Sequence, residues 1–133
     1  MPYVRTQVLV LRCTDYSEHS QVVAMLSRDM GQFHGLAKGS RRPRKDGRAP
    51  FDVLTHCDVV FARRKPGNLH LITEWSARES FPSLRRDLRR FWAAFYGAEV
   101  ALCCTSENPD DGPVYAHLLA FLRRMEEGED PSS

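Results

Sequence analysis

The first half of the chain alternates apolar and polar positions, which is typical of β-strands with one face on a core. In residues 51–64 the apolar face consists of Phe51, Val53, Thr55, Cys57, Val59 and Phe61. The intervening His56 and Asp58 are polar, so we expect them to face solvent. A turn at 66–68 with Pro, Gly and Asn leads into a second strand at 69–75, which predicts a β-hairpin.

Three shorter strands are predicted upstream, at residues 6–14, 20–28 and 32–39. The stretches between them, DYSEHS and DMG, are rich in turn-forming residues. Five strands with short connections predict a small antiparallel barrel or sandwich. The number five favours the OB architecture, a partly open Greek-key barrel that binds oligonucleotides, over other small barrels.

From Phe81 onward the apolar spacing changes to three, four or seven residues, as in an amphipathic helix. The positions concerned are Leu84, Leu88, Phe91, Trp92, Phe95 and Leu102. A second helix is predicted at 114–125, and the acidic tail at 126–133 is predicted to be disordered. The apolar side chains of the two helices need a partner surface, which is each other, the barrel or polypeptide outside this chain.

These patterns predict a mainly β fold with C-terminal α structure. We expect a five-stranded OB-type Greek-key barrel at residues 1–80, followed by a partial helical domain at 81–133.

Composition indicates the cellular compartment of the protein and the redox state of its cysteines. The 133 residues are 42% hydrophobic and 27% charged, as in an ordinary globular protein, with no apolar run of the roughly 20 residues that span a membrane. The N-terminal residues lack a signal peptide pattern, so we expect a cytoplasmic protein. None of the four cysteines (Cys13, Cys57, Cys103 and Cys104) forms a C-x-x-C pair, and we expect them to be reduced and mostly buried, without a metal.

Positive charge gathers between the third and fourth predicted strands. Residues 1–80 hold 13 Lys and Arg against 8 Asp and Glu, whereas residues 81–133 hold 6 against 9. Between positions 38 and 48 stand one acid, Asp46, and the cations Lys38, Arg41, Arg42, Arg44, Lys45 and Arg48. A solubilising loop would carry the same charge, but the planar fork of arginine also matches pairs of phosphate oxygens.

A second basic cluster favours nucleic-acid binding over mere solubility. Arg63, Arg64 and Lys65 occupy the loop between the fourth and fifth strands, which borders the ligand groove of an OB barrel. Two basic loops beside one barrel face predict a track for a nucleic-acid backbone. Base stacking would require exposed rings, for which the candidates are His34, Tyr16 and His70. Phe33, beside His34, is expected to lie in the core.

Catalytic motifs are absent from the sequence. Asp15, Ser17, Glu18 and His19 lie close together in a predicted turn, but sequence proximity does not make a catalytic triad. No phosphate-binding GxxxxGK[ST], HExxH or metal-ligand spacing occurs. We therefore expect a binding protein, not an enzyme, with no cofactor.

Five motifs in a fixed order resemble the RecO family of DNA repair proteins. They are LRCTDYSE at 11–18, RDMG at 28–31, AKGSRRP at 37–43, GNLHLITE at 67–74 and SFPSLRRDL at 80–88. Each motif alone is weak, but together they extend over most of the chain. Family members are commonly nearly twice this long, and many have a four-cysteine zinc site in their second half, which this sequence lacks.

The resemblance implies an OB barrel followed by a helical domain, and a recombination mediator that binds and anneals DNA. RecO-like proteins bind single- and double-stranded DNA and act with RecR to load RecA on DNA covered by single-strand binding protein (SSB). The matching AKGSRRP motif assigns DNA contacts to Lys38, Arg41 and Arg42, and the adjoining Arg44 is included with them. Lys45, Arg48 and residues 63–65 are added from charge alone.

Two other interpretations stay open at this point. The barrel and its apolar helices could form a protein-interaction module, with the basic loop facing an acidic protein segment. The same barrel could also bind RNA, because phosphate contacts do not distinguish the two sugars and only contacts to the 2′-hydroxyl would.

Overall fold

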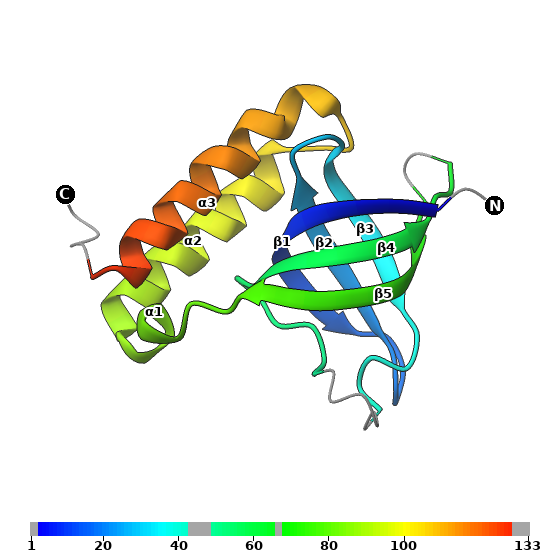
Figure 1. Cartoon of the computed structure of the whole chain (residues 1–133), viewed down its shortest axis with the longest axis horizontal. Coiled ribbons are helices and arrows are strands. Elements are labelled where there is room, and N and C mark those ends of the chain that lie inside the picture. Colours follow the sequence, from blue (N-terminus) through cyan, green and yellow to red (C-terminus); the bar gives the residue numbers. More distant parts are fainter. Residues whose placement is uncertain (1–2, 43–48, 66–67, 129–133) are drawn as a thin grey trace.

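The computed structural model describes residues 3–42, 49–65 and 68–128. The strands come first: β1 (Tyr3–Asp15), β2 (Gln21–Ser27), β3 (Gly31–Ala37), β4 (His56–Ala62) and β5 (His70–Glu79). The helices follow: α1 (Pro82–Arg86), α2 (Leu88–Cys104), the short 3-10 helix η1 (Pro109–Asp111) and α3 (Gly112–Glu126). Helices α2 and α3 lie side by side along one flank of the barrel (Figure 1). Within the described ranges, no helix combines the length and apolar character needed to cross a membrane.

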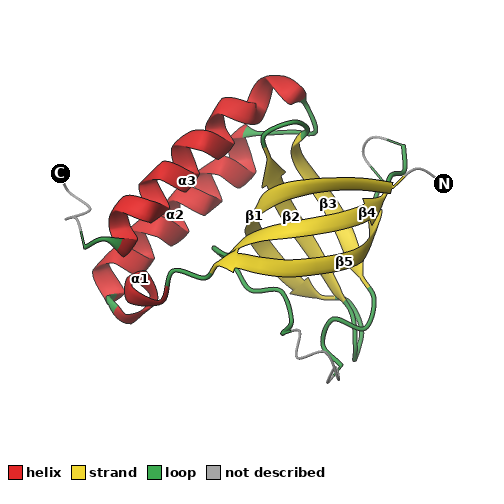
Figure 2. Cartoon of the chain, in the orientation of Figure 1, coloured by secondary structure: helices red, strands yellow, loops and turns green. Residues whose placement is uncertain are grey.

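The five strands close into a barrel in the order β1-β2-β3-β5-β4 (Figure 2). All neighbouring strands are antiparallel except β3 and β5, which are parallel and pair only at Gly35 with His70 and Leu36 with Leu71. The long β1 pairs with β4 through its first half and with β2 through its second half. An irregularity between Val10 and Arg12 marks a bulge, which bends β1 between its two partners. This mixed five-stranded ring confirms the predicted OB-like fold.

Strand β1 is apolar on both faces because each face meets a different core. Val8 and Val10 point into the barrel, whereas Leu9 and Leu11 point outward beneath the helices. The same division on β2 places Met25 inside the barrel, and the outward residues join Leu9 and Leu11 in the second core. The helices therefore share a core with the barrel.

Helix α2 approaches the barrel through small residues. Ala94, Ala98 and Ala101 are its buried side chains, and they face the same core as Leu118 and Leu122 of α3. The predicted partner surface for the helices is therefore both the barrel and the neighbouring helix. The predicted apolar face is wrong in part, since Leu88 and Trp92 are 72% and 57% exposed.

The single helix predicted from Phe81 is two helices. Asp87 has an extended backbone (φ −107°, ψ 110°) and accepts hydrogen bonds from the backbone N–H groups of Arg89 and Arg90. An aspartate in this role is a strong N-cap, so it ends α1 and starts α2. The spacing of apolar residues continues unchanged across Asp87, so it did not predict the break between α1 and α2.

The strand predicted at 51–64 begins only at His56. Leu54 has a positive φ of 63°, which lies outside the β region, and the chain turns there. Phe51 and Leu54 are both buried, but Phe51 enters the barrel core and Leu54 enters the core beneath the helices. The apolar residues at 51–55 are therefore explained by a turn that sends side chains into two different cores, and not by a strand.

His56 is buried, contrary to its predicted exposure, because α3 covers this end of β4. Its Nε2 lies 2.8 Å from the Tyr115 hydroxyl and its Nδ1 lies 2.9 Å from Glu79 Oε1. Arg123 of α3 donates two hydrogen bonds to the same Glu79 carboxylate, at 2.7 and 3.1 Å. This network joins β4 and β5 to α3.

Two glycines allow the β2–β3 turn to contact the helical segment closely. Gly31 has φ +70°, and a Cβ there would overlap the carbonyl oxygens of Ser106 and Asn108. A Cβ at Gly112, the first residue of α3, would overlap the carbonyl oxygen of Arg28. The glycine of the RDMG motif is therefore required by this contact.

The predicted disordered tail starts too early. Glu126 is the last residue of α3, and its carboxylate accepts hydrogen bonds from the backbone N–H groups of Ser83 and Leu84 at the start of α1. Gly128 accepts a hydrogen bond from Arg90. The remainder of the predicted tail, 129–133, lies outside the described residues.

The shared core predicts that helix packing stabilises the barrel. Leu122→Ala removes a fully buried side chain and should lower the free energy of unfolding by about 2–5 kcal/mol. Leu88→Ala, at an exposed position, is the control and should change it by less than about 0.5 kcal/mol. Urea unfolding followed by circular dichroism measures both, and equal effects would contradict this packing.

The Glu79 network predicts a pH dependence. Hydrogen bonds from Arg123 hold the pKa of Glu79 well below its usual value of 4.5, at about 2. A carboxylate with a depressed folded pKa stabilises the fold above its unfolded pKa, and this contribution is lost as pH falls. The stability advantage of the wild type over Glu79→Gln should therefore shrink from pH 4.5 towards pH 2. Glu74→Gln, on the same strand, controls for loss of a carboxylate, and a constant advantage would contradict the assignment.

Candidate nucleic-acid interface

The first part of the basic loop packs on the turn between β1 and β2. The backbone N–H of Arg41 donates to the His19 carbonyl at 3.0 Å, and its guanidinium donates to the Ser17 carbonyl at 3.0 Å. The same guanidinium lies 3.4 Å from Asp15 Oδ1. Arg41 therefore holds two loops together, and its charge is partly engaged within the protein.

Among the described cations of this loop, Lys38 and Arg42 point to solvent. Both are exposed, and neither makes an ion pair with another described residue. They line a hollow of about 420 Å³ together with Tyr16, Ser17, His19, Ser20, Leu36 and Gly39. Tyr16 is 64% exposed, so this hollow combines two cations with an accessible aromatic ring. Arg44, Lys45 and Arg48, which were also predicted to contact DNA, lie outside the described residues.

The second basic loop follows β4. Arg63, Arg64 and Lys65 are all exposed, as its predicted role requires. The backbone N–H of Arg64 donates to Nδ1 of His70 at 2.8 Å, so the proton of this ring resides on Nε2, which donates to Glu107 at 3.0 Å. The buried His70 side chain thus fixes the backbone of this loop, while the three cationic side chains of the loop remain in solvent.

His70 cannot serve as the predicted stacking residue. Its side chain is 0% exposed and packs against the rings of Phe33 and Phe61, with centroids 5.7 and 5.3 Å away. Both ring nitrogens are occupied, by Arg64 and Glu107. The role of His70 is to anchor the loop.

His34 does lie on the outer face of β3, and Phe33 lies in the core, as predicted. His34 Nε2 is 2.8 Å from Gln32 Oε1, and Gln32 in turn donates to the Thr105 hydroxyl at 2.9 Å. Partial burial lowers the pKa of His34, and nearby Arg12 lowers it further, which favours the neutral ring. A neutral ring that one hydrogen bond holds on the exposed face of β3 is suited to stacking on a base.

The outward positions of β3 connect the two basic loops. His34 lines a hollow of about 340 Å³ with Asn68 and Leu69, which follow the second basic loop. Leu36, the next outward residue, lines the hollow that contains Lys38 and Arg42. The outer face of β3 thus has cations at each end and the His34 ring between them, and such an arrangement can bind along a phosphate backbone.

Helical residues contribute to this surface in a way that sequence reasoning missed. Thr105, Ser106 and Glu107 line the hollow beside His34, and Gln32 bonds to Leu102 and Thr105, which are 70 and 73 positions away in the sequence. Polar residues after a helix give no local signal of such contacts. The groove is therefore built partly by the connection between α2 and η1.

The cysteines differ in exposure, which corrects one prediction. All four are free thiols, but Cys103 and Cys104 are exposed and Cys57 is buried. Burial raises the pKa of the Cys13 and Cys57 thiols to about 12, so both are unreactive at neutral pH. Within the described ranges, no group of three or more His, Cys, Asp or Glu side chains could hold a metal ion.

The strand order of the closed five-stranded barrel defines a protein of the OB class. Residues 1–81 match the family described as "Recombination protein O N terminal". The chain belongs to the RecO family.

Relatives named DNA repair protein RecO align with most of the chain. The protein from Rhodopirellula baltica is 36% identical over 114 residues, which cover 86% of this chain and 42% of the relative. The protein from Salinibacter ruber is 30% identical over 122 residues, covering 92% and 47%. The protein from Heliobacterium modesticaldum is 37% identical over 100 residues, covering 75% and 36%. The chain thus spans less than half the length of these relatives.

The contacts of Arg41 predict that its removal loosens the β1–β2 turn. In Arg41→Ala the Ser17 carbonyl and Asp15 lose their partner, so hydrogen exchange of the Tyr16 and Ser17 amides should accelerate. Arg42→Ala, at the next exposed arginine, is the control and should leave these amides unchanged. Equal exchange rates in both variants would contradict the structural role of Arg41.

Proposed function

We propose that this chain binds single-stranded DNA along the outer face of β3, as the DNA-binding part of a recombination mediator in DNA repair. The observation that carries the proposal is the placement of exposed cations at both ends of one strand face, with Lys38 and Arg42 at one end and residues 63–65 at the other. Such a face neutralises the backbone phosphates and leaves bases accessible between the loops.

Membership of the RecO family supports the wider role that we propose. The chain acts without enzymatic activity, in the cytoplasm, and binds both single- and double-stranded DNA. It anneals complementary strands and acts with RecR to load RecA on SSB-coated DNA. Annealing follows physically from two neutralised backbones that can approach each other while their bases remain unpaired.

A second candidate function is protein docking. The observation in its favour is an exposed apolar stripe along α2, formed by Leu88, Trp92, Tyr96 and Val100. This stripe lies on the side of α2 away from the buried alanines and is separate from the basic loops. Competition distinguishes the functions, because an oligonucleotide displaces a partner from the basic loops and not from the stripe.

Charge reversal tests DNA binding. Lys38→Glu combined with Arg42→Glu should weaken binding of a single-stranded oligonucleotide by about tenfold or more, because two cations become repulsive. The plot of log affinity against log salt should become shallower by about 1.4, at about 0.7 for each lost phosphate contact. Arg41 is left intact because it holds the loops together.

The matched control is Arg5→Glu with Arg28→Glu, which makes the same change in charge. Arg28 lies in the β2–β3 turn, at the opposite end of β2 from the basic loop (Figure 1). Fluorescence anisotropy measures all three proteins, and circular dichroism checks their folding. Equal loss of affinity in the two double variants would show that only net charge matters and would contradict the assigned face.

A further inference from the structure

Glu107, in the connection between α2 and η1, uses only one of its two carboxylate oxygens. Oε1 accepts a hydrogen bond from His70 Nε2 at 3.0 Å. Oε2 is buried, and no donor among the described residues bonds to it. A buried carboxylate oxygen without a donor costs free energy, because it has lost water and gained no hydrogen bond. A ligand that brings a donor to this carboxylate recovers that loss.

The Glu107 side chain lines the hollow of about 340 Å³ beside His34 and is 15% exposed. Asn68 and Leu69 line the same hollow, and both are exposed. The volume lies at the small end of the range of about 300–1,000 Å³ that is usual for small-ligand pockets. The hollow therefore has room for one small ring, with the unused acceptor of Glu107 at its wall.

His34 adds a second acceptor to this hollow. The Gln32 amide nitrogen donates to the Thr105 hydroxyl, so the Gln32 oxygen accepts from Nε2–H of His34 at 2.8 Å. The lone pair of the neutral His34 ring is thus on Nδ1. Burial lowers the pKa of His34, whereas the Glu107 carboxylate raises it, so the ring and the carboxylate lie within electrostatic reach of each other. A ligand in the hollow therefore meets two acceptors and an exposed ring.

Hydrogen bonds join the hollow to the second basic loop. The backbone N–H of Asn68 donates to the Lys65 carbonyl at 3.1 Å. The backbone N–H of Arg64 donates to His70, which donates in turn to Glu107. The exposed cations of this loop are therefore held beside the hollow, and a strand whose phosphates they bind brings its bases to it.

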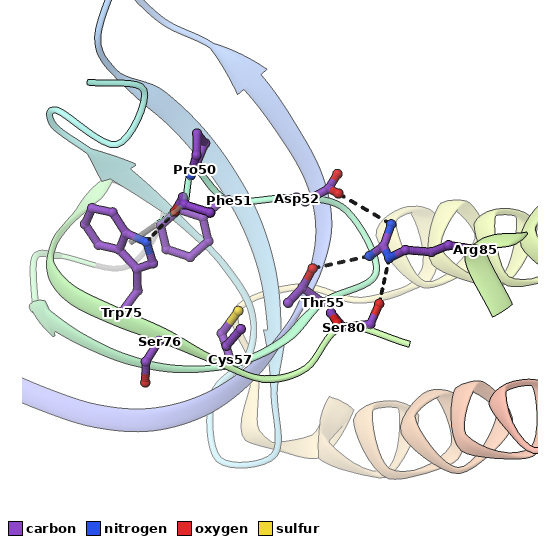
Figure 3. Close-up of a pocket in the computed structure, with 11 residues that line it drawn as sticks. Pro50, Phe51, Asp52, Thr55, Cys57, Trp75, Ser76, Ser80 and Arg85 are labelled. Carbon is purple, nitrogen blue, oxygen red and sulfur yellow. Dashed lines mark hydrogen bonds and ion pairs between the residues drawn. The ribbon is translucent and has the colours of Figure 1, made fainter. Parts of the chain in front are cut away.

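A larger cavity of about 470 Å³, lined by the segment 49–55, β4 and β5, lacks these properties (Figure 3). Its rings, Phe51 and Trp75, are 5% and 7% exposed and belong to the barrel core. The Arg85 guanidinium at its edge already bonds to the Ser80 carbonyl and lies 3.5 Å from Asp52 (Figure 3). The rings are closed to a ligand and the cation is paired, so the site for a base is the hollow beside Glu107.

Two acceptors beside an exposed ring require a planar ligand with hydrogen-bond donors on its edge. Among the DNA bases, guanine has two adjacent donors, N1–H and the N2 amino group, and adenine and cytosine each have one amino group. Thymine has no amino group and presents carbonyl oxygens, which a carboxylate repels. Acceptance of a hydrogen bond from a base amino group is a common mode of base recognition by Asp and Glu. The hollow therefore favours guanine over thymine.

We infer that this hollow takes one guanine of the bound single strand, stacked on His34 and hydrogen-bonded through its donors to Glu107. The inference rests on the proposed function, because the phosphate contacts of the basic loops bring the strand to β3. The carboxyl group turns to present Oε2 to the guanine, while Oε1 stays on His70. The site adds a preference among bases to a track that otherwise contacts phosphates, which carry no sequence information.

Oligonucleotides that differ in one base test this inference on the unmodified protein. The strands are a labelled thymine 15-mer and the same 15-mer with guanine or hypoxanthine at its centre. Fluorescence anisotropy should show that the guanine strand binds about fivefold tighter than the thymine strand. Hypoxanthine stacks as guanine does but lacks the amino group, so it should lose most of this gain. The salt dependence should be equal for all three strands, since their phosphates are the same.

Glu107→Gln tests the acceptor itself. Glutamine keeps an oxygen for His70 but replaces the unused oxygen with an amide N–H donor, so the preference for guanine should disappear. Glu74→Gln, at an exposed position of β5, makes the same change in charge and should keep the preference. Circular dichroism checks the folding of both variants. If Glu107→Gln fails to fold, the comparison of the three strands on the unmodified protein still decides the question.

The outcomes separate this inference from the proposed function. Lack of binding of every strand would overturn both. Equal, salt-dependent binding of all three strands would overturn the guanine site alone and leave the phosphate track intact. A preference for guanine that hypoxanthine shares in full, or that persists in Glu107→Gln, would show recognition by stacking or by another residue and would also overturn the inference.

Discussion

The structure depends on the burial of both faces of β1 and β2. Val8 and Val10 fill the barrel, while Leu9 and Leu11 on the opposite face require a second apolar layer. A small barrel with two apolar faces on the same strands cannot leave one of them in water without a large loss of hydrophobic free energy. Helices α2 and α3 cover that face, and the alanines of α2 allow the close approach. The barrel and helices described here consequently stabilise each other.

This covering also determines which surface is left for a ligand. The helical segment reaches as far as β3, where Gln32 bonds to Leu102 and Thr105. Beyond that point His34 and Leu36 face outward between the two basic loops. The loops are held in place by buried or half-buried contacts, Arg41 for one and His70 for the other. The cationic side chains therefore project from loops whose backbone is held in place by these contacts.

Local pattern predicted the architecture well because strand and helix periods reflect which side of each element is buried. The five strands, the change of period near Phe81 and the basic loop could all be located in this way. The pattern did not predict features that depend on the conformation of a single residue or on a contact distant in the sequence. Leu54 turns the chain inside an alternating stretch, and Asp87 divides an apparently continuous helix. The burial of His56 and His70 depends on Tyr115 and Glu107, which are 59 and 37 residues away.

We propose that this chain itself carries a cationic track for a polyanion. The most direct measurement is the affinity of the unmodified protein for a labelled single-stranded oligonucleotide over a series of salt concentrations. We expect tight binding at low salt that weakens steeply, with log affinity falling by about 0.7 per tenfold rise in salt for each phosphate neutralised. Weak binding that does not change with salt would contradict it and would mean that the basic loops are only solvated charge.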